Sequence, residues 1–294
     1  MTLTPARSWH PYALLLPTAL VLGLFFVVPL GLAAYQSLFS WDLLTEPRWV
    51  GGGNYGALWR SGELVAIAGR TLAYSAVVVS ISLILGLALA LALNREGRFY
   101  AIVRGAIFSA YVVSWVSVGL LWLWILDGEA GVVSRVLRAS GLPTRAWLSD
   151  PNVALYSLAG VTVWKITGYA MVIFLAGLQD IPKSVLEAAA LDGATPRKRF
   201  VHVVWPLLRP TVAFVGTTSL ILSFQAFDIV RVMTQGGPVR STTIFVYAIY
   251  EQVFINLRVG RASALVVAFF VLLVGLTLLQ LWAWRRAGRA RVAT

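Results

Sequence analysis

Residues 153–178 read VALYSLAGVTVWKITGYAMVIFLAGL, an apolar run of 26 residues with a single charged side chain, Lys165. At about 1.5 Å per residue, a helix of this length crosses the roughly 30 Å hydrocarbon core of a bilayer. Five further runs of at least 20 residues are similarly apolar, at 12–36, 71–93, 105–126, 210–230 and 262–284. A membrane β-barrel would instead alternate over segments of about ten residues. The sequence therefore predicts an all-α polytopic membrane protein, a single domain over residues 1–294 with six transmembrane helices.

The composition supports this class. Hydrophobic residues make up 59% of the 294 residues and charged residues 12%, about half the charged share usual in a soluble domain. A soluble fold could not bury so much apolar surface, and disorder is excluded for the same reason. The chain has no cysteine, and its two histidines, His10 and His202, are far apart. We therefore predict no disulfide, no bound metal and no cofactor.

The distribution of basic residues predicts the orientation. The net charge is +12, which in a membrane protein reflects basic cytoplasmic loops more often than nucleic-acid binding. One side would hold 13 Lys/Arg in 63 residues, at 1–11, 94–104, 179–209 and 285–294. The other would hold 10 in 91 residues, at 37–70, 127–152 and 231–261. The first side is predicted to be cytoplasmic, with both termini inside. The first run is too long for the apolar part of a signal peptide, so we expect an uncleaved span.

The 31-residue loop at 179–209 is predicted to form two short helices. Ser184 and Glu187 are spaced as in a capping box, in which the serine caps the helix and the glutamate reaches back. Gly193 follows the alanine-rich turn and favours a helix end with positive φ. So short a helix is not stable alone and must pack on another surface.

The second short helix is predicted to start at the Thr-Pro pair 195–196, an N-cap followed by proline at the first helical position. Pro206 is expected to stop it. The basic stretch 197–199 is expected to face solvent or lipid headgroups.

The same loop resembles a known family motif. Glu187-Ala188-Ala189, then Gly193, then Val203-x-Trp205-Pro206 are similar to the EAA loop of binding-protein-dependent ABC importer permeases. That pattern is E-A-A, three residues, G, nine residues, then I-x-L-P, with valine and tryptophan here in place of isoleucine and leucine. Three stretches resemble the sugar-type branch: Gly53-Asn54-Tyr55, Val163-Trp164-Lys165 and Gly236-Gly237-Pro238.

The resemblance implies that the loop docks in a groove of a cytoplasmic ATPase and couples ATP use to transport. The implied coupling residues are Glu187, Ala188, Ala189, Asp192, Gly193 and Pro206. An alternative role for Glu187 is only to close the capping box, and one for the basic stretch is a contact with the ATPase.

The resemblance also implies the partners and the substrate class. The partners would be a second homologous permease, two ATPase subunits and a periplasmic or extracellular solute-binding protein. The expected solute is a sugar or oligosaccharide, with a glycerol-3-phosphate-type importer as the alternative, and the expected location is the inner (cell) membrane. No lysine follows a P-loop pattern, so ATP would bind to a separate chain, and the protein is expected to be a transport subunit and not an enzyme.

Five residues are candidates for the substrate path. Lys165 lies near the middle of its span, where a charge is costly, so it should face a bundle interior or a wet cavity. It could gate or line the path, or make a structural contact to carbonyl groups or to a neighbouring helix. The other candidates are Tyr169, Gln225, Asp228 and Trp115.

Neighbouring side chains leave these assignments open. Gln225 and Asp228 are three residues apart, which would put them on one face of span five, with Gln225 better matched in depth to Lys165 than Asp228. Trp115 could contact a sugar ring or belong, with Trp122 and Trp124, to an interfacial aromatic belt.

Other functional classes fit less well. An autonomous secondary carrier would usually show repeated halves and several charges within the membrane. An intramembrane enzyme would need a paired nucleophile and base or a set of metal ligands, and the sequence has neither pattern. A phosphate-bearing solute would require cations facing the cavity, of which Lys165 is the only obvious one.

Overall fold

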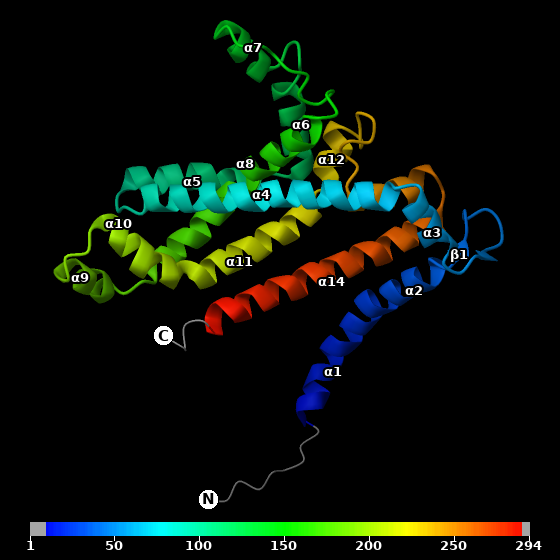
Figure 1. The fold of residues 1–294 in the computed structure, drawn as a ribbon, viewed down its shortest axis with the longest axis horizontal. Coiled ribbons are helices and arrows are strands. Elements are labelled where there is room, and N and C mark those ends of the chain that lie inside the picture. Colours follow the sequence, from blue (N-terminus) through cyan, green and yellow to red (C-terminus); the bar gives the residue numbers. More distant parts are fainter. Residues whose placement is uncertain (1–9, 290–294) are drawn as a thin grey trace, which may run out of the picture. The chain divides into compact units, whose positions relative to one another are not determined.

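The computed structural model describes the backbone of residues 10–289 and the side chains of residues 14–280 and 282. As predicted, the described residues are all-α apart from one short antiparallel hairpin (Figure 1). Within the described residues, five helices are long and apolar enough to cross a membrane, or six if one bent pair is a single span. The outermost parts of both termini, on which the orientation partly depends, lie outside the described residues.

The chain divides into two compact units, residues 66–247 and a unit that joins residues 1–65 to 248–294. Helices α4 (Glu63–Leu93) and α13 (Phe245–Tyr250) each run across a boundary between the units. The joined unit contains α1 (His10–Leu22), the π-helical turn η1 (Gly23–Val27), α2 (Val28–Gln36), β1 (Phe39–Ser40), β2 (Arg48–Trp49), α3 (Gly53–Arg60), the π-helical turn η3 (Glu251–Ile255) and α14 (Val259–Arg289).

The Gly53-Asn54-Tyr55 motif holds the joined unit together after α2. The Asn54 amide donates hydrogen bonds to the carbonyl oxygens of Ser37 at 2.8 Å and Phe39 at 2.9 Å. The hydroxyl groups of Tyr55 and Ser37 lie 2.7 Å apart. The start of α14 approaches so closely that a Cβ on Gly260 would overlap the carbonyl of Phe39. The motif is therefore structural in this chain.

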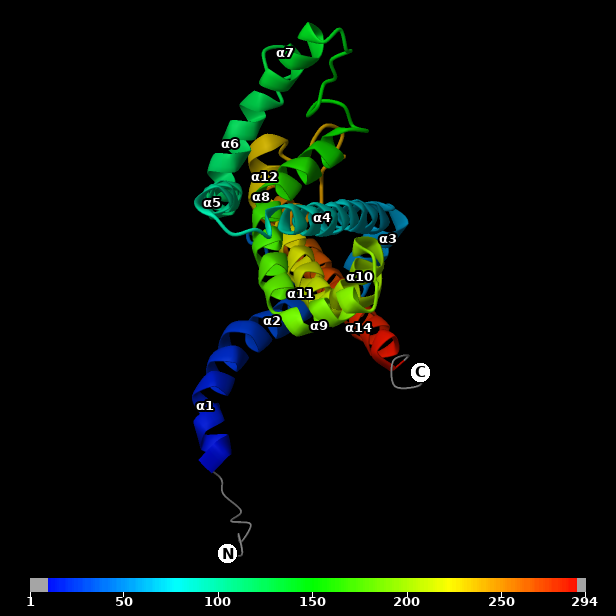
Figure 2. The same cartoon turned by 90° about the vertical axis from the view of Figure 1, so that its left-hand side faces the viewer.

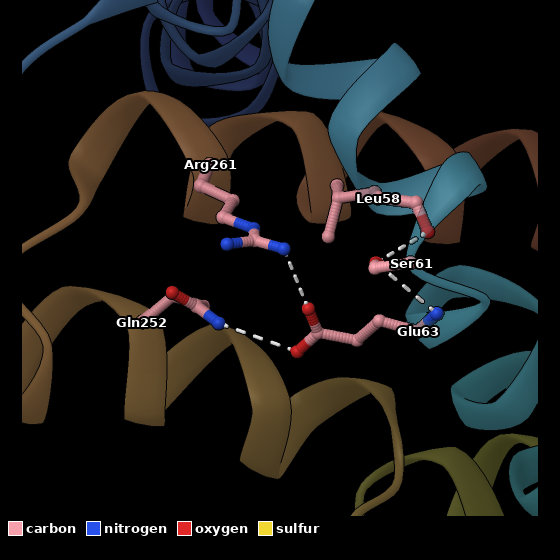
Figure 3. A network of polar contacts seen from close by, with 5 residues as sticks. All are labelled: Leu58, Ser61, Glu63, Gln252 and Arg261. Carbon is pink, nitrogen blue, oxygen red and sulfur yellow. Dashed lines mark hydrogen bonds and ion pairs between the residues drawn. The ribbon is translucent and has the colours of Figure 1, made fainter.

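A polar network ties three segments of the same unit (Figure 3). The carboxylate of Glu63, at the start of α4, lies 2.9 Å from the guanidinium of Arg261 in the first turn of α14. The side-chain amide of Gln252 in η3 donates to the same carboxylate at 3.4 Å, and Gln252 is almost fully buried. Because the pair is mostly buried, it fixes where these segments meet.

The unit of residues 66–247 is built around α8. Besides most of α4, it contains α5 (Arg98–Val112), α6 (Trp115–Ile125), α7 (Val132–Ala139), α8 (Ala154–Gln179), α9 (Lys183–Leu191), α10 (Pro196–Arg199), the π-helical turn η2 (Phe200–Val204), α11 (Trp205–Phe224) and α12 (Phe227–Met233). Helix α8 packs against α5 and α11. It also meets α4, where the hydroxyl groups of Tyr74 and Thr162 lie 2.6 Å apart and a Cβ on Gly86 would overlap Ala170.

Two predicted spans differ from straight helices. The third, 105–126, is broken between α5 and α6, which bend by 101° (Figure 1). Val113 and Ser114 are extended at this break, and the β-branched pair Val112-Val113 favours a helix only weakly. The fifth, 210–230, is part of a longer helix, Pro196–Phe224, and ends before Gln225. The second span is also longer than predicted, because α4 begins at Glu63.

Candidate functional site

The loop 179–209, predicted to be cytoplasmic, forms α9 and α10 at the ends of α8 and α11 (Figure 2). Ile181, just before α9, is buried in the apolar core of the α8 unit, and Leu186 packs against that core. Helix α9 therefore does not stand alone, which meets the requirement that so short a helix packs on another surface.

The predicted capping box does not form. Helix α9 begins at Lys183, its N-cap is Pro182, and no side chain caps it. Ser184 therefore lies inside the first turn, and Glu187 is too far along the helix to reach back. Glu187 is exposed and has no hydrogen bond or ion pair within the part of the chain that the structure describes. Its carboxylate is available to a partner molecule.

The end of α9 follows the prediction. Gly193 has a φ of 74°, the left-handed region that favours glycine. The amide of Ala194 donates to Ala189 and that of Gly193 donates to Ala190, both at 3.0 Å, which is a Schellman motif. Thr195 then caps α10, accepting from the amide of Lys198 at 3.4 Å.

The helix stop predicted at Pro206 is wrong. The helix that begins at Pro196 does not stop there but continues through η2 into α11. Pro206 lies in the first turn of α11, and the amide of Trp205 bonds five residues back, to Phe200. A proline ring clashes with the carbonyl four residues before it, and a π-helical turn ahead of it removes that conflict.

One face of α9 is uncovered. Ser184, Glu187, Ala188 and Leu191 share that face by helical spacing, and all four are exposed. Leu191, at the end of this face, is 90% exposed. The alanines allow close approach of another surface. On the side facing α10, Glu187 also lines a cavity of about 200 Å³.

Replacing Gly193 by valine is expected to distort the turn between α9 and α10. No atom lies near enough to hinder a Cβ, so the cost comes from the backbone, at about 1–3 kcal/mol for a β-branched residue at this φ. We expect membrane insertion to be unchanged. If the loop couples to an ATPase, as the resemblance implies, ATP-driven uptake should fall about fivefold or more. Gly216→Val in α11 is the control, because that helical glycine has no positive φ and only loose neighbours. Full uptake by Gly193→Val would contradict the role of the turn.

Lys165 is buried against the break between α5 and α6, with 1% of its surface exposed. Its ammonium group donates hydrogen bonds to the carbonyl oxygens of Ala110 at 3.2 Å and Tyr111 at 3.0 Å, and also to Val113. The last carbonyls of a helix have no partner within it and carry its negative dipole end, so a cation there is favourable.

Three of the five path candidates lie together at this break. The ammonium of Lys165 is 4.8 Å from the ring centre of Trp115 and 5.9 Å from that of Tyr111. Tyr169, one turn after Lys165, stacks on Tyr111 at 5.0 Å between ring centres. These contacts make one cluster of an ammonium group and three aromatic rings.

Gln225 and Asp228 are not on one face of span five, contrary to the prediction. Gln225 is the C-cap residue of α11, whereas Asp228 lies in the first turn of α12. Lys165 has no ion pair with Asp228 within the described residues. The contact of Lys165 with carbonyl groups, one of the roles that the sequence left open, is present in the structure. The sequence did not show that these carbonyl groups are at the end of α5, because backbone oxygens leave no residue signature.

A polytopic helical fold with a short exposed helix between its fourth and fifth candidate spans fits a permease subunit. Residues 82–288 match the family described as binding-protein-dependent transport system inner membrane component, and the chain belongs to that family. Its apolar helices are therefore spans of an inner-membrane permease.

Named relatives cover almost the whole chain. It is 34% identical over 277 residues to the sn-glycerol-3-phosphate transport system permease protein UgpA of Yersinia pestis bv. Antiqua (strain Antiqua), covering 93% of each protein. It is also 34% identical over 274 residues to the protein of the same name from Agrobacterium fabrum (strain C58 / ATCC 33970), covering 92% of each.

A solved structure shares the fold. A chain of a bacterial ABC transporter involved in the import of the acidic polysaccharide alginate superimposes with a TM-score of 0.79 at 23% identity, covering 95% of this chain and 96% of that one.

Proposed function

We propose that this chain is one of two homologous permeases of an ABC importer and forms half of its translocation path. Two cytoplasmic ATPases and an external solute-binding protein complete the assembly. The observation that carries the proposal is the uncovered face of α9, with Leu191 exposed and Glu187 unpaired in the described structure. ATP would be hydrolysed on the separate ATPase chains, and their closure would move α9 and the helices continuous with it.

Each coupling residue is proposed to have its own role in docking the ATPase. Glu187 would contact a basic or donor group of the ATPase, and Ala188 and Ala189 would allow close packing. Gly193 and Asp192 would set the turn that follows, and Pro206 would lie where the loop passes into α11. The break between α5 and α6 would be held beside the path by Lys165, Tyr169 and Trp115. Gln225 and Asp228 would lie at the second break, between α11 and α12.

The solute is proposed to be a sugar or oligosaccharide. Lys165, the cation nearest the middle of a span, is already hydrogen-bonded to three carbonyl groups, so it is not free to bind a phosphate. Glycerol 3-phosphate is the second candidate, because the two relatives named above carry that substrate in their names.

A test of the solute uses the importer assembled with its own binding protein. ATP hydrolysis in proteoliposomes would be measured with the binding protein loaded with neutral sugars or with glycerol 3-phosphate. We expect stimulation by a neutral sugar and little by glycerol 3-phosphate. Stimulation only by glycerol 3-phosphate would establish the second candidate, and no ATP hydrolysis with any loaded binding protein would contradict an importer.

The proposed orientation places both termini and α9 in the cytoplasm. A reporter active only in the cytoplasm, fused after residue 294, is expected to give signal, whereas the same reporter fused near Pro143, between α7 and α8, is expected to be silent. The charge asymmetry of the loops is the physical reason. The opposite pattern of signals would overturn the orientation.

A further inference from the structure

An apolar groove runs between α4, α8 and α11 in the unit of residues 66–247. It has a volume of about 480 Å³. The groove is lined by Leu83, Leu87 and Leu91 of α4, Phe174 of α8, and Trp205 and Val212 of α11. The site is large enough for a small ligand, and its lining favours a hydrocarbon over a polar solute.

The length of the groove matches one leaflet of a bilayer. Its lining on α4 extends from Ser80 to Leu91, eleven positions and so about 16 Å along the helix. The full hydrocarbon core is about 30 Å thick. A transmembrane helix of the second permease would need a groove along most of that thickness, whereas one acyl chain needs only half. The lining lies in the half of α4 that ends at Leu93, next to the basic loop at 94–104.

An unpaired cation lies beside the groove. Arg209 is four residues after Trp205 and three before Val212, so it is on nearly the same face of α11 as these two lining residues. It is exposed and has no hydrogen bond or ion pair in the described part of the chain. Arg209 lies directly before the predicted fifth span, 210–230, at the level where lipid headgroups meet a spanning helix.

We propose that the groove holds an acyl chain of an anionic phospholipid from the cytoplasmic leaflet, whose phosphate is bound by Arg209. A guanidinium group matches a phosphate with two parallel hydrogen bonds. The basic stretch 197–199 precedes the groove on the same continuous helix and favours anionic over zwitterionic headgroups. Trp205 lines the groove, and tryptophan is enriched at membrane interfaces. Only the choice of leaflet rests on the proposed orientation.

The test uses the purified importer and a phosphatidylglycerol with a photoactivatable group in its acyl chain. We expect label in residues 80–91, and Arg209→Gln should lower it about fivefold or more, as loss of a charge-assisted contact would. Arg60→Gln is the matched control, since Arg60 is also exposed but lies on α3. Unlabelled phosphatidylglycerol should compete, whereas phosphatidylcholine and inorganic phosphate should not.

Two further variants test lipid binding in the groove if Arg209→Gln does not assemble. Arg209→Lys keeps the cation and should retain most of the label, whereas Ile84→Trp fills the groove and should lose it without any change of charge. Equal labelling of Arg209→Gln and the parent would overturn the proposal, as would equal competition by phosphatidylcholine or by inorganic phosphate. Crosslinks from residues 80–91 to the second permease would show a protein occupant instead. Labelling requires no transport, so its failure would leave the proposed function standing.

Discussion

Replacing Lys165 by methionine is expected to reduce uptake by about tenfold or more. The change keeps the bulk of the side chain but removes the donor for three carbonyl oxygens at the end of α5. No water replaces that donor in a bilayer core, and an unpaired buried acceptor costs about 1–3 kcal/mol, equivalent to roughly a tenfold shift in a conformational equilibrium for each 1.4 kcal/mol. The angle between α5 and α6 should then no longer be fixed.

Lys165→Arg is the control, because a guanidinium group also donates to several carbonyl oxygens. It should transport better than Lys165→Met. The break itself can be measured, since the chain has no cysteine to interfere. Spin labels on cysteines introduced at Ile102 and Leu120, exposed positions on α5 and α6, should give one narrow distance in the parent and a broad distribution in Lys165→Met. A narrow, unchanged distance with normal uptake would reject the role of Lys165.

The spans could be predicted because the bilayer imposes a simple rule on composition. A run of about 20 apolar residues is readable in the sequence whatever its partners are. The breaks in spans three and five could not be predicted from the sequence. Neither Val113–Ser114 nor Gln225–Ala226 contains glycine or proline, so the usual signals of a helix break are missing. Tertiary contacts, including the bonds from Lys165, stabilise the first of them.

The structure of the coupling loop could be predicted at residues whose type favours one particular backbone conformation. Gly193 is at a positive φ and Thr195 caps α10, as expected. The capping box failed because Pro182 starts α9 earlier than Ser184 requires. Pro206 was misjudged because a π-helical turn, which has no clear sequence pattern, carries the helix past it.

Replacing Leu191 by aspartate is expected to abolish productive docking of the ATPase. A docked Leu191 would bury an apolar side chain worth about 1.5–3 kcal/mol, and an aspartate there would add the cost of burying an unpaired charge. The sum predicts affinity at least about a hundredfold weaker. Leu191 is 90% exposed in the chain alone, so the substitution should not unfold the permease.

The most direct test of whether α9 couples this protein to an ATPase is the affinity of the purified ATPase for the permease pair. The affinity is measured with the parent chain and with Leu191→Asp. Leu44→Asp is the control, since Leu44 is 80% exposed but lies between β1 and β2. The account predicts tight binding for the parent and for Leu44→Asp, and binding at least about a hundredfold weaker for Leu191→Asp. Equal affinity of all three would contradict it.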